Sequence, residues 1–178
     1  MLKQRTKTAG ETIRIALAGN PNAGKSTIFN RITGFRQHVG NYPGVTVEKK
    51  EGEFSWNGCQ MILTDLPGIY SLTASSEEER AARRYILDEK PDVLIDVVDA
   101  SNLERNLYLA TQFMELNVPM VIALNMSDVA RTRGIEFDLE KLSRLLGVRI
   151  IPTVGSSGEG IRELIAAAVE TGVQPEPA

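Results

Sequence analysis

The sequence predicts an α/β protein in which a mixed sheet of six strands lies between two layers of helices. Three observations indicate this fold class. Short apolar runs alternate with segments that carry apolar residues at helical spacing, the order found in a mostly parallel sheet covered on both faces. A loop with two glycines joins the first run to the first helical segment. Asn57-Gly58 is a strong hairpin signal, so the hairpin is expected to add one antiparallel edge strand.

The six predicted strands are runs in which apolar and β-branched residues are continuous or alternate with polar ones. They are residues 13–18, 47–56, 59–64, 93–98, 119–124 and 148–151. The segment 34–46, between the first helix and the hairpin, contains three glycines and Pro43. Because glycine and proline interrupt regular structure, we expect this segment to be a loop.

The predicted helices show helical spacing of apolar residues and recognisable ends. They are residues 26–33, 77–87, 103–116, 139–146 and 160–170. Ser75 or Ser76 can cap the helix at 77–87, and the three glutamates that follow lie in its first turn, where the helix dipole favours negative charge. Gly147 ends the helix at 139–146.

Length and composition indicate a single globular domain. The chain has 178 residues, of which 42% are hydrophobic and 24% charged, and its net charge of −3 gives no reason to expect nucleic acid as a partner. A single cysteine excludes an internal disulfide, and no apolar run is long enough to cross a bilayer. We expect residues 1–12 to be a disordered leader, 13–170 the domain, and 171–178 a tail or the start of a linker.

One stretch fits the P-loop pattern, in which a glycine and four further residues precede glycine-lysine-serine. It consists of Gly19, Asn20, Pro21, Asn22, Ala23, Gly24, Lys25 and Ser26, followed by Thr27. Because a predicted strand precedes it and a helix follows, backbone N–H groups and the helix dipole are expected to hold phosphate. Lys25 would reach the β- and γ-phosphates, and Ser26 would bind Mg²⁺. The fold is therefore expected to be a three-layer P-loop NTPase fold.

Two further stretches are expected to read the base. Asn125 and Asp128 follow a predicted strand, and the Asp128 carboxylate can accept hydrogen bonds from the N1–H and the amine of guanine, a donor pair that adenine lacks. Asn125 can tie this loop to the phosphate loop. After the strand at 148–151, Gly155, Ser156 and Ser157 could present backbone N–H groups to the guanine oxygen, although such loops are common.

Two loops are expected to respond to the γ-phosphate. Asp65 ends a predicted strand and can hold Mg²⁺ through a water molecule, while the Gly68 N–H can contact the γ-phosphate. Thr46 can complete the Mg²⁺ shell while that phosphate is present, and Gly44 and Val45 precede it in the same candidate loop. The two loops would order with GTP and relax after hydrolysis, as the switch loops of GTPases do.

Four runs together have a more specific likeness: 19–27, 39–48, 65–72 and 125–128. They resemble the cytoplasmic G domain of the bacterial ferrous iron transport protein B (FeoB) family, within the Ras-like GTPases. The most family-specific run is Asn-Tyr-Pro-Gly-Val-Thr-Val-Glu at 41–48, and the order of elements extends the resemblance from about residue 13 to about residue 170. The resemblance implies a Ras-like mixed sheet and hydrolysis of GTP to GDP and phosphate.

The resemblance also implies partners and a location. In this family the G domain precedes a small helical domain and a membrane-embedded iron pore, so this chain is expected to be a piece of a larger protein at the cytoplasmic face of the bacterial inner membrane. The partners are then GTP and GDP, the helical and transmembrane parts of the same polypeptide, and no nucleic acid; the oligomeric state, including a homo-oligomer, is left open.

Three positions bear on mechanism. Ile69 occupies the place of a glutamine that orients the attacking water in many small GTPases. In related GTPases the asparagine that matches Asn22 holds K⁺ against the phosphates, so we expect K⁺ to take part of the role of an arginine finger. Met126 replaces a lysine whose stem covers the base, which predicts modest GDP affinity and fast release.

Two alternatives to a transporter domain are left open. The chain could be a potassium-dependent GTPase of tRNA modification or ribosome assembly, which shares the Asn-Pro-Asn-x-Gly-Lys-Ser loop but normally adds RNA-binding parts. It could instead be a nucleotide-sensing module with negligible hydrolysis, an option that Ile69 allows.

Overall fold

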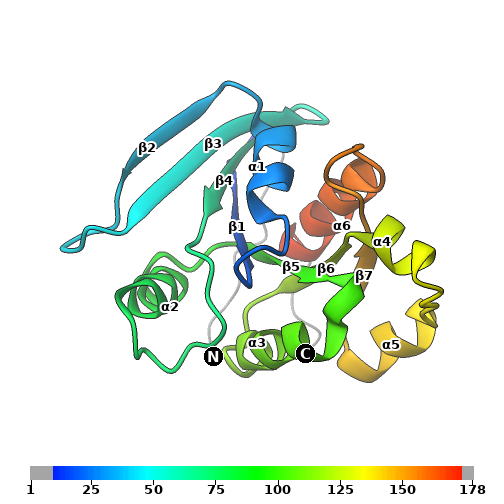
Figure 1. Ribbon diagram of the computed structural model, residues 1–178. Coiled ribbons are helices and arrows are strands. Elements are labelled where there is room, and N and C mark those ends of the chain that lie inside the picture. Colours follow the sequence, from blue (N-terminus) through cyan, green and yellow to red (C-terminus); the bar gives the residue numbers. More distant parts are fainter. Residues whose placement is uncertain (1–9, 174–178) are drawn as a thin grey trace.

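The computed structural model describes residues 10–173, and a seven-stranded sheet runs through its centre (Figure 1). The spatial order of the strands is β2-β3-β4-β1-β5-β6-β7. Their bounds are β1 Ile13–Gly19, β2 Gln37–Asn41, β3 Glu48–Trp56, β4 Cys59–Asp65, β5 Val93–Asp99, β6 Met120–Asn125 and β7 Arg149–Pro152. The five strands from β4 to β7 in this order are parallel, whereas β2 and β3 are antiparallel to their neighbours. The predicted α/β class and mixed sheet are confirmed.

The predicted count of six strands with one antiparallel edge strand is wrong. The strand β2 lies within residues 34–46, which we expected to be a loop, and it pairs with β3 from Gln37 opposite Gly52 to Asn41 opposite Glu48. It therefore forms the edge of the sheet, and β3 has a neighbour on both sides. Four of the five residues of β2 are exposed, so its sequence carries no alternation of buried and exposed residues that could have revealed it.

Six α-helices and one short 3-10 helix complete the described part of the chain. They are α1 Lys25–Thr33, α2 Glu77–Glu89, η1 Ala100–Asn102, α3 Leu103–Glu115, α4 Ser127–Thr132, α5 Leu139–Leu146 and α6 Ile161–Val173. Ser76, one of the two predicted caps of α2, accepts a hydrogen bond from the N–H of Glu79 at 3.1 Å. The helix α4 was not predicted, because six residues are too few to show helical spacing.

The predicted ends of the domain lie partly outside the described residues. Strand β1 begins at Ile13, as predicted, but residues 1–9 of the expected leader are not described. The last helix continues to Val173, so residues 171–173 of the expected tail are helical, and residues 174–178 are again not described. No helix within residues 10–173 is long and apolar enough to cross a membrane.

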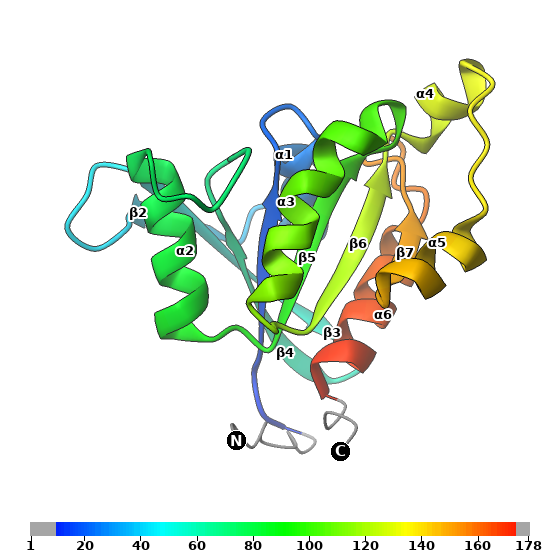
Figure 2. The same ribbon diagram turned by 90° about the horizontal axis from the view of Figure 1, so that it is seen from below.

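The sheet separates two apolar cores. Ala82 of α2 and Leu109 of α3 are fully buried in the core on one face, which α5 also covers. Phe29 of α1 and Leu164 of α6 are buried in the core on the other face. Figure 2 shows α3 lying across β5 on the near side of the sheet. Because both faces are covered, functional groups can gather only at the ends of the strands, and in parallel sheets ligands bind at the carboxyl ends.

Candidate functional site

The phosphate loop, residues 19–26, connects the carboxyl end of β1 to the start of α1. Gly24 caps the helix with φ of 92°, and the Gly24 carbonyl accepts the first helical hydrogen bond from Ile28 N–H at 3.2 Å. A Cβ on Gly24 would lie 2.2 Å from Nδ2 of Asn125, so only glycine fits this position. The unpaired N–H groups of the first helical turn are the usual binding site for phosphate.

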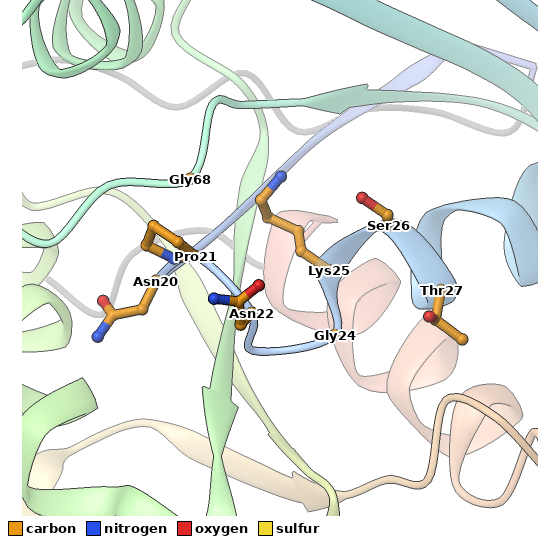
Figure 3. A pocket seen from close by; sticks show the side chains of 8 residues that line it. All are labelled: Asn20, Pro21, Asn22, Gly24, Lys25, Ser26, Thr27 and Gly68. Atoms are coloured by element: carbon orange, nitrogen blue, oxygen red, sulfur yellow. The ribbon is translucent and has the colours of Figure 1, made fainter.

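A cavity of about 510 Å³ opens at this loop, and Figure 3 shows the side chains that line it. The lining residues are Asn20, Pro21, Asn22, Gly24, Lys25, Ser26, Thr27 and Gly68. Lys25 and Ser26 leave the start of α1 on the same side (Figure 3). The cavity therefore brings together most of the predicted phosphate loop and the glycine of the second predicted switch loop, which lies more than forty positions further along the chain.

Lys25 and Asp65 form an ion pair beside the cavity. Nζ of Lys25 contacts Oδ1 of Asp65, and the two side chains are 10% and 11% exposed. Burial raises the pKa of Asp65, and the charge and hydrogen bond of Lys25 oppose that shift. A nearly buried lysine and carboxylate thus lie where the phosphate and Mg²⁺ ligands were expected.

The loop that follows Asp65 runs along the phosphate loop. The N–H of Ile69 donates to the Gly19 carbonyl at 3.2 Å, and a Cβ on Gly68 would lie 3.2 Å from Cα of Pro21. Ile69 is 3% exposed and belongs to the core, so its side chain does not reach the cavity. Further along, the Leu72 N–H donates to Oε1 of Gln112 on α3 at 2.6 Å. Gln112 was not predicted, since nothing in the sequence distinguishes it from other polar residues of a helix.

The loop between β2 and β3 is anchored by Tyr42, which sequence reasoning did not single out. Its hydroxyl donates to the Asp65 carbonyl at 2.9 Å, and its ring meets that of Tyr85 edge-on at 6.1 Å between centroids. Burial, with smaller effects of Tyr85 and Asp65, raises the pKa of the Tyr42 hydroxyl, which therefore stays protonated as a donor. Thr46, in the same loop, is exposed and is not among the residues that line the cavity.

Asn125, at the end of β6, connects the phosphate loop to the β7–α6 loop, residues 153–160. Its Nδ2 donates to the Ala23 carbonyl at 2.9 Å, while Oδ1 accepts from Thr153 Oγ1 at 3.1 Å and from Gly155 N–H at 3.0 Å. The side chain is 2% exposed. The expected tie between Asn125 and the phosphate loop is confirmed.

The remaining predicted base-reading residues surround this link. Met126 adopts a left-handed backbone conformation with φ of 58°, and its Cε would lie 3.6 Å from a Cβ on Gly24. Asp128 is exposed in the first turn of α4. In the β7–α6 loop Gly155 is buried, whereas Ser156 and Ser157 are exposed. Since none of these lines the cavity at the phosphate loop, they form a second, adjacent part of the candidate site.

Comparison with known proteins identifies related sequences. Residues 13–168 match the family model described as Ferrous iron transport protein B. The Fe(2+) transporter FeoB of Escherichia coli is 53% identical over 156 residues, which cover 85% of this chain and 20% of that protein. An Fe(2+) transport protein A/Fe(2+) transporter FeoB fusion protein of Porphyromonas gingivalis is 52% identical over 159 residues, covering 89% of this chain and 19% of that protein. The chain thus spans about a fifth of the length of these relatives.

Solved structures give the same likeness. The FeoB G-domain from Methanococcus jannaschii is 48% identical with a TM-score of 0.83, and the match covers 92% of this chain and 99% of that one. A mutant of S. thermophilus NFeoB bound to mGDP is 46% identical with a TM-score of 0.87, covering 90% of this chain and 62% of that one. The expected three-layer P-loop NTPase fold is confirmed.

Proposed function

Because the chain belongs to the ferrous iron transport protein B family, we propose that it is the G domain of a ferrous iron transporter, which binds GTP and hydrolyses it to GDP and phosphate. The observation that carries this proposal is the double contact of Asn125, which holds the phosphate loop and the β7–α6 loop together. This contact sets the spacing between a site for phosphate and a site for a base. The solved S. thermophilus relative bound to mGDP supports a guanine nucleotide as the ligand.

Each part of the nucleotide has its own set of residues in this proposal. The backbone N–H groups of residues 19–27 and the ammonium of Lys25 bind the phosphates, and Gly68 contacts the γ-phosphate. Met126 covers the guanine ring with its thioether, Asp128 accepts from the base, and the 155–157 backbone faces the guanine oxygen. Asn125 orients both loops. Gly44, Val45 and Thr46 close over the phosphates from the loop that Tyr42 anchors.

The donor set beside the cavity fits Mg²⁺. The cation prefers carboxylate and hydroxyl oxygens. Ser26 supplies a hydroxyl in the lining of the cavity, and Asp65 supplies a carboxylate beside it. We assign Ser26, Thr46 and Asp65 as the residues that hold it. When bound, Mg²⁺ neutralises negative charge on the phosphate oxygens. A bound cation would also oppose the desolvation that raises the pKa of Asp65, and so would favour the ionised carboxylate.

Hydrolysis in this proposal is slow and is stimulated by K⁺. Ile69 is buried in the core, so no side chain at that position orients the attacking water. Asn22 is exposed at the cavity with φ of 66° and is the proposed K⁺ ligand. A cation there adds positive charge where the transition state gains negative charge.

We place this domain at the cytoplasmic face of the bacterial inner membrane, joined to helical and transmembrane parts of the same polypeptide. Residues 13–170 form the G domain in this proposal. Its partners are GTP and GDP, and the switch loops pass the nucleotide state to the membrane part. The length of the curated relatives, about five times that of the matched segment, supports further parts.

Base specificity tests the proposal directly. With Mg²⁺ present, calorimetry is expected to detect binding of GDP and GTP and none of ATP. Asp128→Asn is expected to exchange guanosine for xanthosine nucleotides, because the introduced amide can donate to the C2 oxygen that replaces the guanine amine. Binding of ATP as tightly as GTP, or binding of neither, would refute the proposal.

The role of K⁺ is tested separately. Replacing Na⁺ by K⁺ is expected to raise single-turnover GTP hydrolysis, and Asn22→Gly is expected to bring the ratio of the two rates to one. Glycine is the sharper substitution than alanine, because it accepts the positive φ of this position and removes only the carboxamide. Equal rates in both salts for the unchanged chain would refute the role of K⁺ and would leave the proposal of GTP binding intact.

A further inference from the structure

Arg31 reaches from α1 to the β7–α6 loop, which lies more than 120 positions away in the sequence. Its Nε donates to the Gly155 carbonyl at 2.8 Å, and Nη2 donates to the Ser156 carbonyl. The backbone of Gly158 lies against the same guanidinium, since a Cβ there would be 3.1 Å from Nη1. One planar side chain therefore holds three residues of this loop.

The two carbonyl contacts also fix where N–H groups point. In a trans peptide the carbonyl and the N–H of the next residue point in opposite directions. Because the Gly155 carbonyl faces Arg31, the N–H of Ser156 points away from it. The planar guanidinium fork meets two consecutive carbonyls at once, so it constrains the plane of the peptide between them more than a single donor would.

Ser156 carries an N–H that is free to bind a ligand. In this loop the Gly155 N–H donates to Asn125, and the Ser157 N–H donates to the Val154 carbonyl at 3.2 Å. Within residues 10–173 the Ser156 N–H has no protein acceptor. Gly155 itself packs against α1, with Cγ1 of Ile28 3.1 Å from where its Cβ would be, so the loop is held close to the helix that starts at the phosphate loop.

We propose that Arg31 is a positioning residue that aims the Ser156 N–H at oxygen 6 of guanine and so slows nucleotide release. The inference rests on the proposed guanine-nucleotide binding. The inference gives α1 two roles in the same site. The first turn of the helix binds the phosphates, while Arg31, near the other end of the helix, holds the β7–α6 loop. It also modifies the expectation of fast GDP release from Met126, because Arg31 acts against it.

The test compares Arg31→Ala, Arg31→Lys and the unchanged chain in stopped-flow dissociation of fluorescent GDP. Arg31→Ala is expected to release GDP about fivefold faster, as loss of one well-placed hydrogen bond would do. Arg31→Lys is expected to fall between, since an ammonium lacks the planar fork. Arg144→Ala is the control, because Arg144 is an exposed arginine that pairs with Glu140 on α5, and it is expected to release GDP like the unchanged chain.

A second ligand separates positioning from a general loss of structure. In 6-thio-GDP a sulfur, a weak hydrogen-bond acceptor, replaces oxygen 6, so the acceleration caused by Arg31→Ala is expected to shrink to less than about twofold. Equal acceleration for both ligands, or no acceleration with GDP, would overturn the inference. Absence of GDP binding in the unchanged chain would instead refute the proposed function, so the two failures are distinguishable.

Discussion

Replacing Asn125 by alanine tests whether one buried side chain holds the two halves of the site together. The substitution removes one donor and one acceptor that together make three hydrogen bonds. The Ala23 carbonyl, the Gly155 N–H and the Thr153 hydroxyl then lose their partner. Since Asn125 is 2% exposed, water can replace these bonds only by entering the gap that the shorter side chain leaves.

The expected loss of stability follows from these three groups. A buried polar group without a partner costs about 1–3 kcal/mol, and we take the lower value for each because water can enter the gap. The free energy of unfolding should therefore fall by roughly 3 kcal/mol, and the melting temperature of a domain of this size by roughly 6–12 °C. GDP affinity should fall as well, because neither loop is then held at the spacing that the nucleotide needs.

Urea unfolding followed by circular dichroism and by Trp56 fluorescence measures the loss of stability. Asn125→Asp is an informative second variant, because it keeps the acceptor but can donate to the Ala23 carbonyl only when protonated. The buried carboxyl should have a raised pKa, so this variant should be more stable at pH 5 than at pH 8. Asn41→Ala, at the exposed edge of β2, is the control and should change stability by less than about 0.5 kcal/mol.

One result would refute this reasoning. If Asn125→Ala unfolds within about 1 kcal/mol of the unchanged chain and binds GDP with the same affinity, the link does not hold the site together.

Three further substitutions probe other features of the fold. Burial raises the pKa of Asp96 from 3.8 to about 8. Between these two pH values unfolding releases the proton of Asp96, so the free energy of unfolding should fall with rising pH by up to about 1.4 kcal/mol per pH unit. Asp96→Asn should remove this slope in urea unfolding measured from about pH 5 to about pH 8. Gly160→Ala should lower the melting temperature clearly more than Gly34→Ala, because both have positive φ but only at Gly160 would the added Cβ lie 2.0 Å from a backbone carbonyl oxygen. Gln112→Ala should leave the Leu72 N–H without its acceptor, and amide hydrogen exchange at Leu72 should become faster; unchanged exchange would show that the contact does not hold this loop.

The features that the sequence predicted correctly are those that short stretches determine. The phosphate loop needs Gly24 in a left-handed conformation, and the hairpin needs Asn57-Gly58, so each can be recognised from a few neighbouring residues. The buried parallel strands appear as apolar runs because both of their faces are covered. Asn125 could be assigned because it follows such a strand in a four-residue motif.

The features that were missed depend on contacts between distant parts of the chain. Arg31 has the sequence context of an exposed helical arginine, and only the fold brings the Gly155 carbonyl to it. In the same way, Tyr42 meets the Asp65 carbonyl across 23 positions, and the ion pair of Lys25 and Asp65 spans 40.

The sequence by itself therefore determined which chemical groups the site contains and on which elements they lie. Apart from the link between Asn125 and the phosphate loop, only the tertiary structure decided which of these groups contact one another, and it alone revealed β2. The physical reason is that turn geometry and apolar periodicity arise among near neighbours in the chain. The strand β2 is instead held by backbone hydrogen bonds to β3, which form whatever side chains the strand carries.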